Sequence, residues 1–502
     1  MTRTVDPRPQ LLTYPDSLGS DLRALGDLLE GPLAGVFHGV HILPPFPPSG
    51  DRGFAPLTYD RIDPRFGTWD DIRRIASGHD VVLDLMINHI SRQSREFQDF
   101  ERHGRASPFA DLFITVDKIW PDGQPLAAEV AQIFLRKPDA PFSDVTIADT
   151  GRHERVWTSF GSADWSEQID LDVTASATRT LITGWLRQFA ERGVRIVRLD
   201  AVGYVIKKPG TTCFMVEPEI FGFLAWVAAV ADSLGLVILP EVHDVYTTHQ
   251  RLSAHGFWTY DFVLPGLLLH AFEAGQSERL VEHMATSPER QFTNLDCHDG
   301  IPVRPDLDGI LTPAEMADLA DDVRRQGGNV NRILSGAHSA AGDVHQLNCT
   351  YYSALGEDDE RYVAARAVQL FARGVPQVYY VGLLAGANDW NAVERTGDGR
   401  AINRHDYTSS EILEAFDRDV VRRVLDLIRL RNTHPAFDGA LSVEGNGHSI
   451  SLRWQRGDDV VSLDVDFDDG SAVLTDGSRV ERIARWPSEP HHASLARAPA
   501  MP

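Results

Sequence analysis

Three acidic residues, Asp200, Glu241 and Asp299, each stand at or just after the end of a short apolar run of the chain. A pair of carboxyl groups is what a retaining glycosyl transfer requires, because one carboxylate attacks the sugar while a protonated partner assists the leaving oxygen. The two groups then need different pKa values. Arg198 lies two residues before Asp200 on the same face of a strand, so we expect it to keep Asp200 ionised. The apolar run before Glu241 is expected to favour its protonated form.

The runs that lead to these acids are typical of buried parallel strands, because they are apolar without alternation. They cover residues 81–89, 195–200, 236–241 and 292–299. Helical patterns over 178–191 and 218–234 alternate with them. In a (β/α)8 barrel the carboxyl ends of all eight strands meet at one mouth, where catalytic groups gather. The sequence therefore predicts an α/β fold, a (β/α)8 TIM barrel, with the acids at its mouth.

Two stretches interrupt the alternation of strands and helices. Residues 91–165, with several Pro and Gly turns, predict an insertion subdomain after strand 3. Residues 303–350 are polar and predict a lid-like acceptor-loop subdomain after strand 7, over the mouth. Alternating apolar and polar residues within 435–502 predict a small C-terminal antiparallel β domain. The catalytic barrel is then built from residues 1–90, 166–302 and 351–434.

Composition narrows the classes of partner. The chain has 502 residues and a net charge of −24, so most of its surface repels nucleic acid and anionic membranes. Its three cysteines fit neither a zinc pattern nor a disulfide framework, and its first residues form no apolar leader, so we expect a cytoplasmic location. The insertion has no dense Asp/Asn cluster and the chain no phosphate-loop motif, so neither a metal ion nor an organic cofactor is expected. The sequence leaves the oligomeric state open.

Short motifs and longer blocks resemble a known family. Four short motifs occur in the order found in the α-amylase superfamily: Asp84-x-x-x-Asn88-His89, Arg198-x-Asp200, Glu241 and His298-Asp299. Longer blocks resemble the sucrose phosphorylase branch of this superfamily, glycoside hydrolase family 13: residues 42–47, 51–54, 88–94, 198–204, 299–301, 348–356, 374–382 and 399–405. The expected C-terminal β domain carries little of this resemblance.

The resemblance implies a role for each acid. Asp200 would be the nucleophile that forms a β-glucosyl-enzyme, Glu241 the general acid/base, and Asp299 the group that stabilises an oxocarbenium-like transition state. It also implies substrate contacts from further side chains: Asp51, Phe54, His89, Phe160, Arg198, Tyr204, His298, Asp343, Gln346 and Arg400. The segment 340–346 resembles a mobile acceptor loop of the branch, which helps phosphate rather than water to attack the glucosyl-enzyme.

One departure from the branch concerns the acceptor. In members of the branch that use sucrose, the residue that matches His345 looks like tyrosine. Arg136 and Lys137 stand where the branch places a positively charged residue of the acceptor site. Histidine and two cations suit a phosphate ester, as in the subgroup that cleaves sucrose 6′-phosphate. The resemblance therefore predicts a retaining glucosyl phosphorylase that converts sucrose 6′-phosphate and inorganic phosphate to α-glucose 1-phosphate and fructose 6-phosphate, with phosphate as co-substrate.

Other functions remain open on the sequence alone. Within the branch, the substrate could be unphosphorylated sucrose, glucosylglycerol or glucosylglycerate, if Arg136 and Lys137 are only a solvated loop. A hydrolase acting on oligosaccharides is a further alternative, which the blocks around 340–356 disfavour. A barrel without catalytic activity, used as a scaffold, is disfavoured because all three acids are present.

Overall fold

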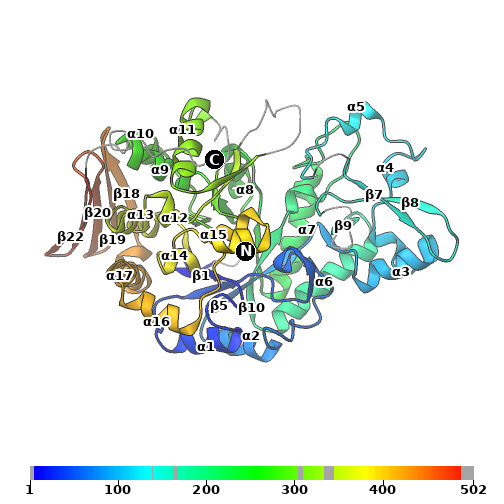
Figure 1. The fold of residues 1–502 in the computed structure, drawn as a ribbon, viewed down its shortest axis with the longest axis horizontal. Coiled ribbons are helices and arrows are strands. Elements are labelled where there is room, and N and C mark those ends of the chain that lie inside the picture. Colours follow the sequence, from blue (N-terminus) through cyan, green and yellow to red (C-terminus); the bar gives the residue numbers. More distant parts are fainter. Residues whose placement is uncertain (1–4, 138–139, 162–167, 304–308, 333–343, 488–502) are drawn as a thin grey trace.

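Eight parallel strands form a nearly closed barrel at the centre of the molecule (Figure 1). The computed structural model describes residues 5–137, 140–161, 168–303, 309–332 and 344–487, and of 330–345 only the backbone where it is described. In spatial order the barrel strands are β11 (Val237–Pro240), β10 (Val194–Asp200), β5 (Asp80–Met86), β2 (Gly39–Ile42), β1 (Gln10–Thr13), β17 (Val375–Tyr379), β13 (Gln291–Thr293) and β12 (Thr259–Asp261). The predicted (β/α)8 barrel is confirmed.

Helices alternate with these strands and surround the barrel. They include α1 (Leu22–Glu30), α2 (Trp69–Ala76), α6 (Ser176–Glu191), α7 (Glu219–Leu234), α8 (Tyr246–Ala254), α9 (Leu264–Ala274), α10 (Glu278–Thr286), α13 (Asp359–Phe371), α16 (Ser409–Asp417) and α17 (Asp419–Thr433). The helices predicted over 178–191 and 218–234 are α6 and α7. In the described part of the chain, no helix combines the length and the apolar character needed to cross a membrane.

The inside of the barrel changes from apolar to charged along its strands. Val82, Ile196 and Phe292 belong to one buried cluster in the barrel. Two residues after Ile196 on the same face of β10 comes Arg198, whose register partner on β5 is Asp84. The charged side chains therefore stand on an apolar layer, nearer the carboxyl ends of the strands.

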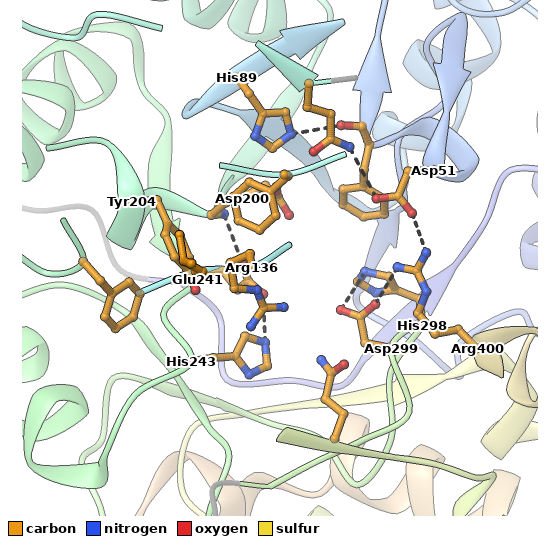
Figure 2. Close-up of a pocket in the computed structure, with 17 residues that line it drawn as sticks. Asp51, His89, Arg136, Asp200, Tyr204, Glu241, His243, His298, Asp299 and Arg400 are labelled. Atoms are coloured by element: carbon orange, nitrogen blue, oxygen red, sulfur yellow. Dashed lines mark hydrogen bonds and ion pairs between the residues drawn. The ribbon is translucent and has the colours of Figure 1, made fainter. Parts of the chain in front are cut away.

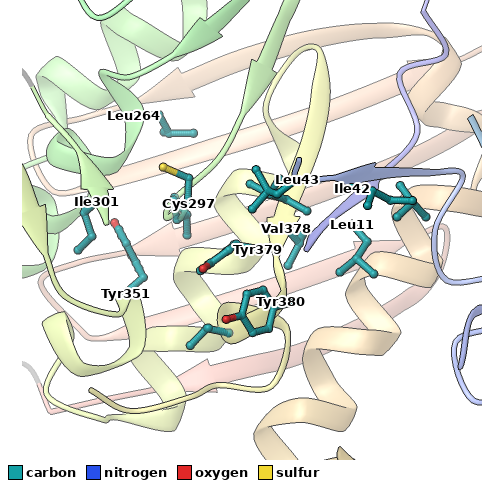
Figure 3. Close-up of a cluster of buried hydrophobic side chains, with 14 of the residues drawn as sticks. Leu11, Ile42, Leu43, Leu264, Cys297, Ile301, Tyr351, Val378, Tyr379 and Tyr380 are labelled. Carbon is teal, nitrogen blue, oxygen red and sulfur yellow. The ribbon is translucent and has the colours of Figure 1, made fainter. Parts of the chain in front are cut away.

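A larger apolar cluster fills the space between the barrel wall and its helices (Figure 3). Leu11, Ile42 and Val378 on neighbouring strands are fully buried in it, as are Tyr379 and Tyr380 at the end of β17. This close packing gives the strand ends a rigid base.

The insertion after β5 projects to one side of the barrel, drawn in cyan in Figure 1. Its elements are β6 (His89–Ser91), α3 (Arg95–His103), α4 (Val116–Ile119), α5 (Ala127–Val130), β7 (Phe142–Thr146), β8 (His153–Trp157) and β9 (Gln168–Asp170). β6 pairs antiparallel with β9, and His89 lies opposite Asp170. This pairing returns the chain to the barrel beside the end of β5.

Two further groups of short elements lie between barrel elements. After β13 come β14 (Ile301–Pro302), α11 (Pro313–Arg325), β15 (Asn329–Arg332), β16 (Val344–Asn348) and α12 (Tyr351–Ala354). After β17 come α14 (Tyr380–Leu383), α15 (Trp390–Thr396) and the 3-10 helix η6 (Gly399–Asn403). Near the N-terminal end, β3 (Pro48–Gly50), the 3-10 turn η1 (Asp51–Gly53) and β4 (Ala55–Pro56) follow β2.

The chain ends in a five-stranded antiparallel sheet of neighbouring strands, as predicted. Its strands are β18 (Ala440–Gly445), β19 (Ser449–Arg456), β20 (Asp459–Asp466), β21 (Ser471–Asp476) and β22 (Arg479–Arg485). The sheet packs beside α13, and Trp454 Nε1 donates to the carbonyl oxygen of Phe371 at 2.8 Å. It lies on the side of the barrel away from the insertion (Figure 1). The boundaries given above for the other subdomains stay predictions.

Candidate active site

A cavity of about 290 Å³ brings together side chains from the carboxyl ends of the barrel strands and from the insertion (Figure 2). It is lined by most of the residues that the sequence predicts for the site: Asp51, Phe54, His89, Arg136, Phe160, Asp200, Tyr204, Glu241, His298, Asp299, Gln346 and Arg400. Arg198 is buried next to it and contacts Asp200 and Glu241. This cavity is the candidate active site.

Besides Arg198, three predicted residues are not placed in the cavity. The Nζ of Lys137 donates to Thr158 Oγ1 at 2.7 Å, and Lys137 is not among the lining residues. Asp343 and the side chain of His345 lie outside the described residues, although the backbone of residue 345 belongs to β16. Of the predicted acceptor-phosphate set, Arg136 alone is seen to face the cavity.

The guanidinium of Arg198 joins the two carboxylates predicted to carry the chemistry. Its Nη1 lies 3.0 Å from Asp200 Oδ1, and its Nη2 lies 3.0 Å from Glu241 Oε1. Its other partner is Asp84, which also accepts a contact from His41 Nε2 at 2.9 Å. Because Arg198 and Asp84 are both buried, the cation is held in place and fixes the two carboxylates relative to each other.

Glu241 has more partners that stabilise its charged form than Asp200 has. Its Oε2 accepts from the backbone N–H of Ala201 at 3.0 Å, and its Oε1 lies 2.9 Å from His243 Nε2. Burial acts to raise the pKa of Glu241, but Arg198, His243 and the Ala201 N–H outweigh burial and hold that pKa well below its usual value.

Asp200 shows the opposite behaviour. Burial and the negative charge of Glu241 raise the pKa of Asp200 well above its usual value, and the contact with Arg198 does not compensate. The expectation that Arg198 keeps Asp200 ionised while Glu241 is protonated is therefore wrong, because the two pKa values are shifted in the opposite directions. The reason is that one guanidinium serves three carboxylates, Asp84, Asp200 and Glu241, and the further donors named above lie on the side of Glu241.

Asp299 supplies a fixed negative charge across the cavity. It lies 3.4 Å from His298 Nε2, 3.6 Å from Arg400 Nη1 and 3.4 Å from Arg404 Nη2. Burial opposes ionisation, but these groups together hold the pKa of Asp299 well below its usual value. Burial lowers the pKa of His298 to about 4, so its imidazole is neutral at pH 7.

Asp51 and Arg400 form an ion pair beside Asp299. Asp51 Oδ1 accepts from Arg400 Nη2 at 2.7 Å. Burial acts to raise the pKa of Asp51, but Arg400 and Arg404 outweigh it and lower that pKa. The alternation of acids and arginines provides fixed hydrogen-bonding groups of both kinds along this wall, as a polyhydroxylated ring requires.

Aromatic rings form the other walls. Phe54 stacks on His298 with a centroid distance of 4.9 Å and an interplanar angle of 7°. Phe160 and Tyr204 meet edge to face with their ring centroids 5.0 Å apart, and the ring centroids of Tyr204 and Phe214 are 4.7 Å apart. Such faces suit the apolar side of a sugar and a developing positive charge on its ring.

A buried ammonium connects the insertion to the barrel next to the cavity. Lys207 Nζ lies 2.7 Å from Asp170 Oδ2, 3.0 Å from Ser159 Oγ and 3.3 Å from Asn88 Oδ1, and it also donates to the Tyr204 carbonyl. These oxygen atoms are ligands of the kind that a hard cation prefers. Lys207 supplies the positive charge at this point from the chain itself.

Two groups of side chains in the described residues have the donor types of a metal site. They are Glu241 with His243 and Asp299, and Cys297 with His298 and Asp299. Both share residues with the candidate catalytic set and are engaged with Arg198, Arg400 or Arg404, whose charges oppose a second cation. The donor set therefore does not fit a resident metal ion.

Comparisons with known proteins agree with this site. Residues 36–262 match the family model described as the catalytic domain of alpha-amylase. A sucrose 6(F)-phosphate phosphorylase of Thermoanaerobacterium thermosaccharolyticum is 50% identical over 461 residues, which cover 91% of this chain and 94% of that protein. The chain belongs to the α-amylase family, in its sucrose phosphorylase branch.

Other relatives in the branch carry different names. A sucrose phosphorylase of Streptococcus mutans is 41% identical, with 94% of this chain and 98% of that protein covered. A glucosylglycerol phosphorylase of Marinobacter adhaerens is 40% identical, with 93% and 96% covered. A crystal structure of sucrose 6F-phosphate phosphorylase from Thermoanaerobacter thermosaccharolyticum matches with a TM-score of 0.93 at 48% identity, covering 96% of this chain and 99% of that one. The branch therefore contains several acceptor classes on one fold.

Several residues that line the cavity were not predicted from the sequence. They are Leu135, Gln168, Ala201, Phe214 and His243. For His243, its position two residues after Glu241 was the available signal. Phe214 reaches the cavity because Gly203 leaves room: a Cβ at Gly203 would lie 2.5 Å from the Phe214 ring. Nothing in the local sequence reveals that contact.

Proposed function

We propose that this chain is a retaining glucosyl phosphorylase that cleaves sucrose 6′-phosphate with inorganic phosphate to α-glucose 1-phosphate and fructose 6-phosphate. The activity rests on one observation above all, the pair Asp200 and Glu241 held by Arg198 at the base of the cavity. The choice of acceptor rests on Arg136 in the cavity wall and on the 50% identity to a sucrose 6(F)-phosphate phosphorylase.

The first half-reaction breaks the glucosidic bond. Asp200 attacks the anomeric carbon, Glu241 gives a proton to the departing fructosyl oxygen, and a β-glucosyl ester on Asp200 results. The raised pKa of Asp200 and the lowered pKa of Glu241 oppose this assignment, so donor binding has to move the proton from Asp200 to Glu241. A donor oxygen that accepts a hydrogen bond from Glu241 favours that transfer, because it stabilises the protonated acid.

The second half-reaction replaces the fructosyl group by phosphate. A phosphate oxygen attacks the anomeric carbon and the ester bond to Asp200 breaks, while Glu241 takes up the proton that phosphate releases. Arg136, Gln346 and Arg400 line the cavity and are the groups proposed to hold the phosphate dianion in place of water. As proposed, neither step needs an organic cofactor.

The glucosyl ring is proposed to lie between the polar and the aromatic walls. Asp51, His298 and Arg400 would bind its hydroxyl groups, and Asp299 would stabilise the positive charge of the transition state. Phe54 would support the apolar face of the ring. His89 Nε2 lies 3.1 Å from the Phe54 carbonyl oxygen and so ties this aromatic side to the end of β5.

A panel of donors tests the proposal. The values of kcat/KM with saturating phosphate are compared for sucrose 6′-phosphate, sucrose, glucosylglycerol and glucosylglycerate, and the sugar products are identified. We expect sucrose 6′-phosphate to be preferred and glucose 1-phosphate to form. Equal or better use of sucrose would refute the acceptor assignment, and release of free glucose under saturating phosphate would refute the phosphorylase assignment.

A cytoplasmic location is part of the same proposal. The three cysteines, Cys213, Cys297 and Cys349, are buried and free, which suits a reducing compartment. A phosphorylated disaccharide and inorganic phosphate are also substrates that a cell retains by their charge.

A further inference from the structure

The turn that carries Asp51 into the cavity has an unusual backbone. Asp51, Arg52 and Gly53 have φ angles of 50°, 46° and 114°, so three successive residues lie at positive φ. At Gly53 only glycine fits, because a Cβ would lie 2.7 Å from the Pro44 carbonyl oxygen. Asp tolerates this region better than most residues, but Arg has no such tolerance. Something must therefore keep Arg52 in the left-handed conformation.

The side chain of Arg52 is held by a different part of the chain. Its Nη2 donates to Ser17 Oγ at 2.9 Å and to Asp406, and its Nη1 donates to the Arg404 carbonyl oxygen at 3.3 Å. The guanidinium carbon also lies 4.1 Å from the centre of the Tyr14 ring. These partners follow β1 and η6, far from the turn in sequence.

Those partners belong to the wall that faces Asp51. Arg400 in η6 pairs with Asp51, and Arg404 Nε donates to the His298 carbonyl oxygen at 2.6 Å. Ser17 Oγ donates to Asp406 Oδ1 at 2.7 Å, which fixes the acceptor of Arg52 in turn. Arg52 therefore connects the turn that carries Asp51 and Phe54 to the segment that carries Arg400 and Arg404.

The turn separates two cavities. Asp51 and Phe54 line the candidate active site, whereas Gly50, Arg52 and Gly53 line a second cavity of about 320 Å³. Because there is space behind the turn, packing alone does not hold a side-chain-bearing residue in the left-handed conformation there. The anchoring contacts of Arg52 supply what packing does not.

We propose that Arg52 is a positioning residue whose anchored guanidinium keeps the 51–53 turn left-handed, and so aims Asp51 and Phe54 at the sugar. This inference rests on the proposed glucosyl transfer and extends it to a residue that does not touch the cavity. It predicts that the backbone conformation, and not the charge of Arg52, is what catalysis needs.

Two substitutions of Arg52 test whether catalysis needs the backbone conformation of the turn or the charge of Arg52. Arg52→Ala removes the anchor and leaves a residue that disfavours positive φ, whereas Arg52→Gly removes the same anchor and the same charge but accepts positive φ without strain. The substrate is α-D-glucosyl fluoride, whose small leaving group needs no acceptor site. Fluoride release is measured with the full-length chain, and Arg65→Ala is the control, because Arg65 lines the second cavity but pairs with Asp63 and does not contact the turn.

The variants are expected to differ in how much kcat/KM they lose. Displacement of a substrate-binding group by about 1 Å costs about 100-fold, so kcat/KM is expected to fall by about 30-fold in Arg52→Ala, with Arg52→Gly within about fivefold of wild type and Arg65→Ala within about twofold. Asp406→Asn weakens the anchor but keeps Arg52, and we expect a loss between those of the Gly and Ala variants.

The inference is overturned if Arg52→Gly is as impaired as Arg52→Ala, or if Arg52→Ala keeps wild-type activity. Should Arg52→Ala fail to fold, an unimpaired Asp406→Asn or a strongly impaired Arg52→Gly would overturn it equally. A wild-type chain that uses glucosyl fluoride but rejects sucrose 6′-phosphate refutes the proposed donor and leaves this inference standing. A wild-type chain inactive on every glucosyl donor overturns both.

Discussion

Arg198 Nη2 lies 3.0 Å from Glu241 Oε1, and the same guanidinium contacts Asp200 through Nη1. The two acids therefore titrate as a pair, in which Glu241 keeps its charge and raises the pKa of Asp200. Removing the charge of Glu241 is therefore expected to make Asp200 easier to ionise.

The Glu241→Gln variant tests this coupling. Fluoride leaves glucosyl fluoride without a general acid, so the rate of ester formation reports ionised Asp200 alone. Because the folded pKa of Asp200 falls when the neighbouring charge is removed, we expect the acid limb of this rate to move to lower pH than in wild type. The measurement is a rapid-mixing pH profile of fluoride release. An acid limb that stays in place would show that Glu241 does not set the pKa of Asp200.

The nucleophile itself is tested by Asp200→Asn. The amide cannot form the ester, so kcat is expected to fall by at least about 10⁴-fold. Mass spectrometry of Glu241→Gln after mixing with glucosyl fluoride should show the added mass of one glucosyl group, located on the peptide that contains Asp200. Undiminished turnover in Asp200→Asn, or a glucosyl group on another peptide, contradicts the mechanism. Unchanged thermal unfolding of the variant serves as its control.

The placement of Asp200 and Glu241 in one cavity was predictable because its signal is local. Asp200 ends an apolar strand and Glu241 follows one, so strand type and strand end together place both at the mouth of a barrel. The (β/α)8 architecture and the C-terminal sheet followed from the same patterns. These features depend on residues close together in sequence, which a single chain reveals.

The features of the site that the sequence did not predict depend on contacts between distant segments. Besides Arg198, His243 and the Ala201 N–H lower the pKa of Glu241, and the loops after β10 and β11 set their positions. Phe214 lines the cavity through its packing on Gly203, and Gln168 enters it from β9 of the insertion. The direction of Lys137 likewise follows from Thr158, 21 residues away in the chain.

The side chains of Arg136 and Lys137 point in different directions, so the predicted preference for a phosphorylated donor can be assigned to one of them. Arg136 lines the cavity, whereas Lys137 donates to Thr158. A charge-assisted hydrogen bond contributes about 1.5–3 kcal/mol, so Arg136→Ala should lower the preference for sucrose 6′-phosphate over sucrose by about 10- to 150-fold. Lys137→Ala is the matched neighbour and should change that preference much less. The ratio of kcat/KM for the two donors is the measurement, and a larger effect of Lys137→Ala would reverse the assignment.

The buried contact between Lys207 and Asp170 should matter for stability as well as for the site. Their side chains are 1% and 0% exposed, so replacing Lys207 by Met leaves a buried carboxylate without its counter-ion, although Asn88 and Ser159 still donate to it. Breaking a buried pair in this way costs about 3–5 kcal/mol, which we expect in the free energy of unfolding from urea titration. The double variant with Asp170→Asn should lose less than Lys207→Met alone, because no charge then stays buried.

Lys208 provides the matched control for that prediction. It is the next residue, but it is exposed and pairs with the exposed Glu219, so Lys208→Met should change stability little. Because Lys207 also binds the Tyr204 carbonyl and Asn88, its loss should loosen the wall that Tyr204 and His89 form, and KM for the donor should rise in the folded variant. Equal stability of the Lys207 and Lys208 variants would mean that the ammonium does not tie the insertion to the barrel.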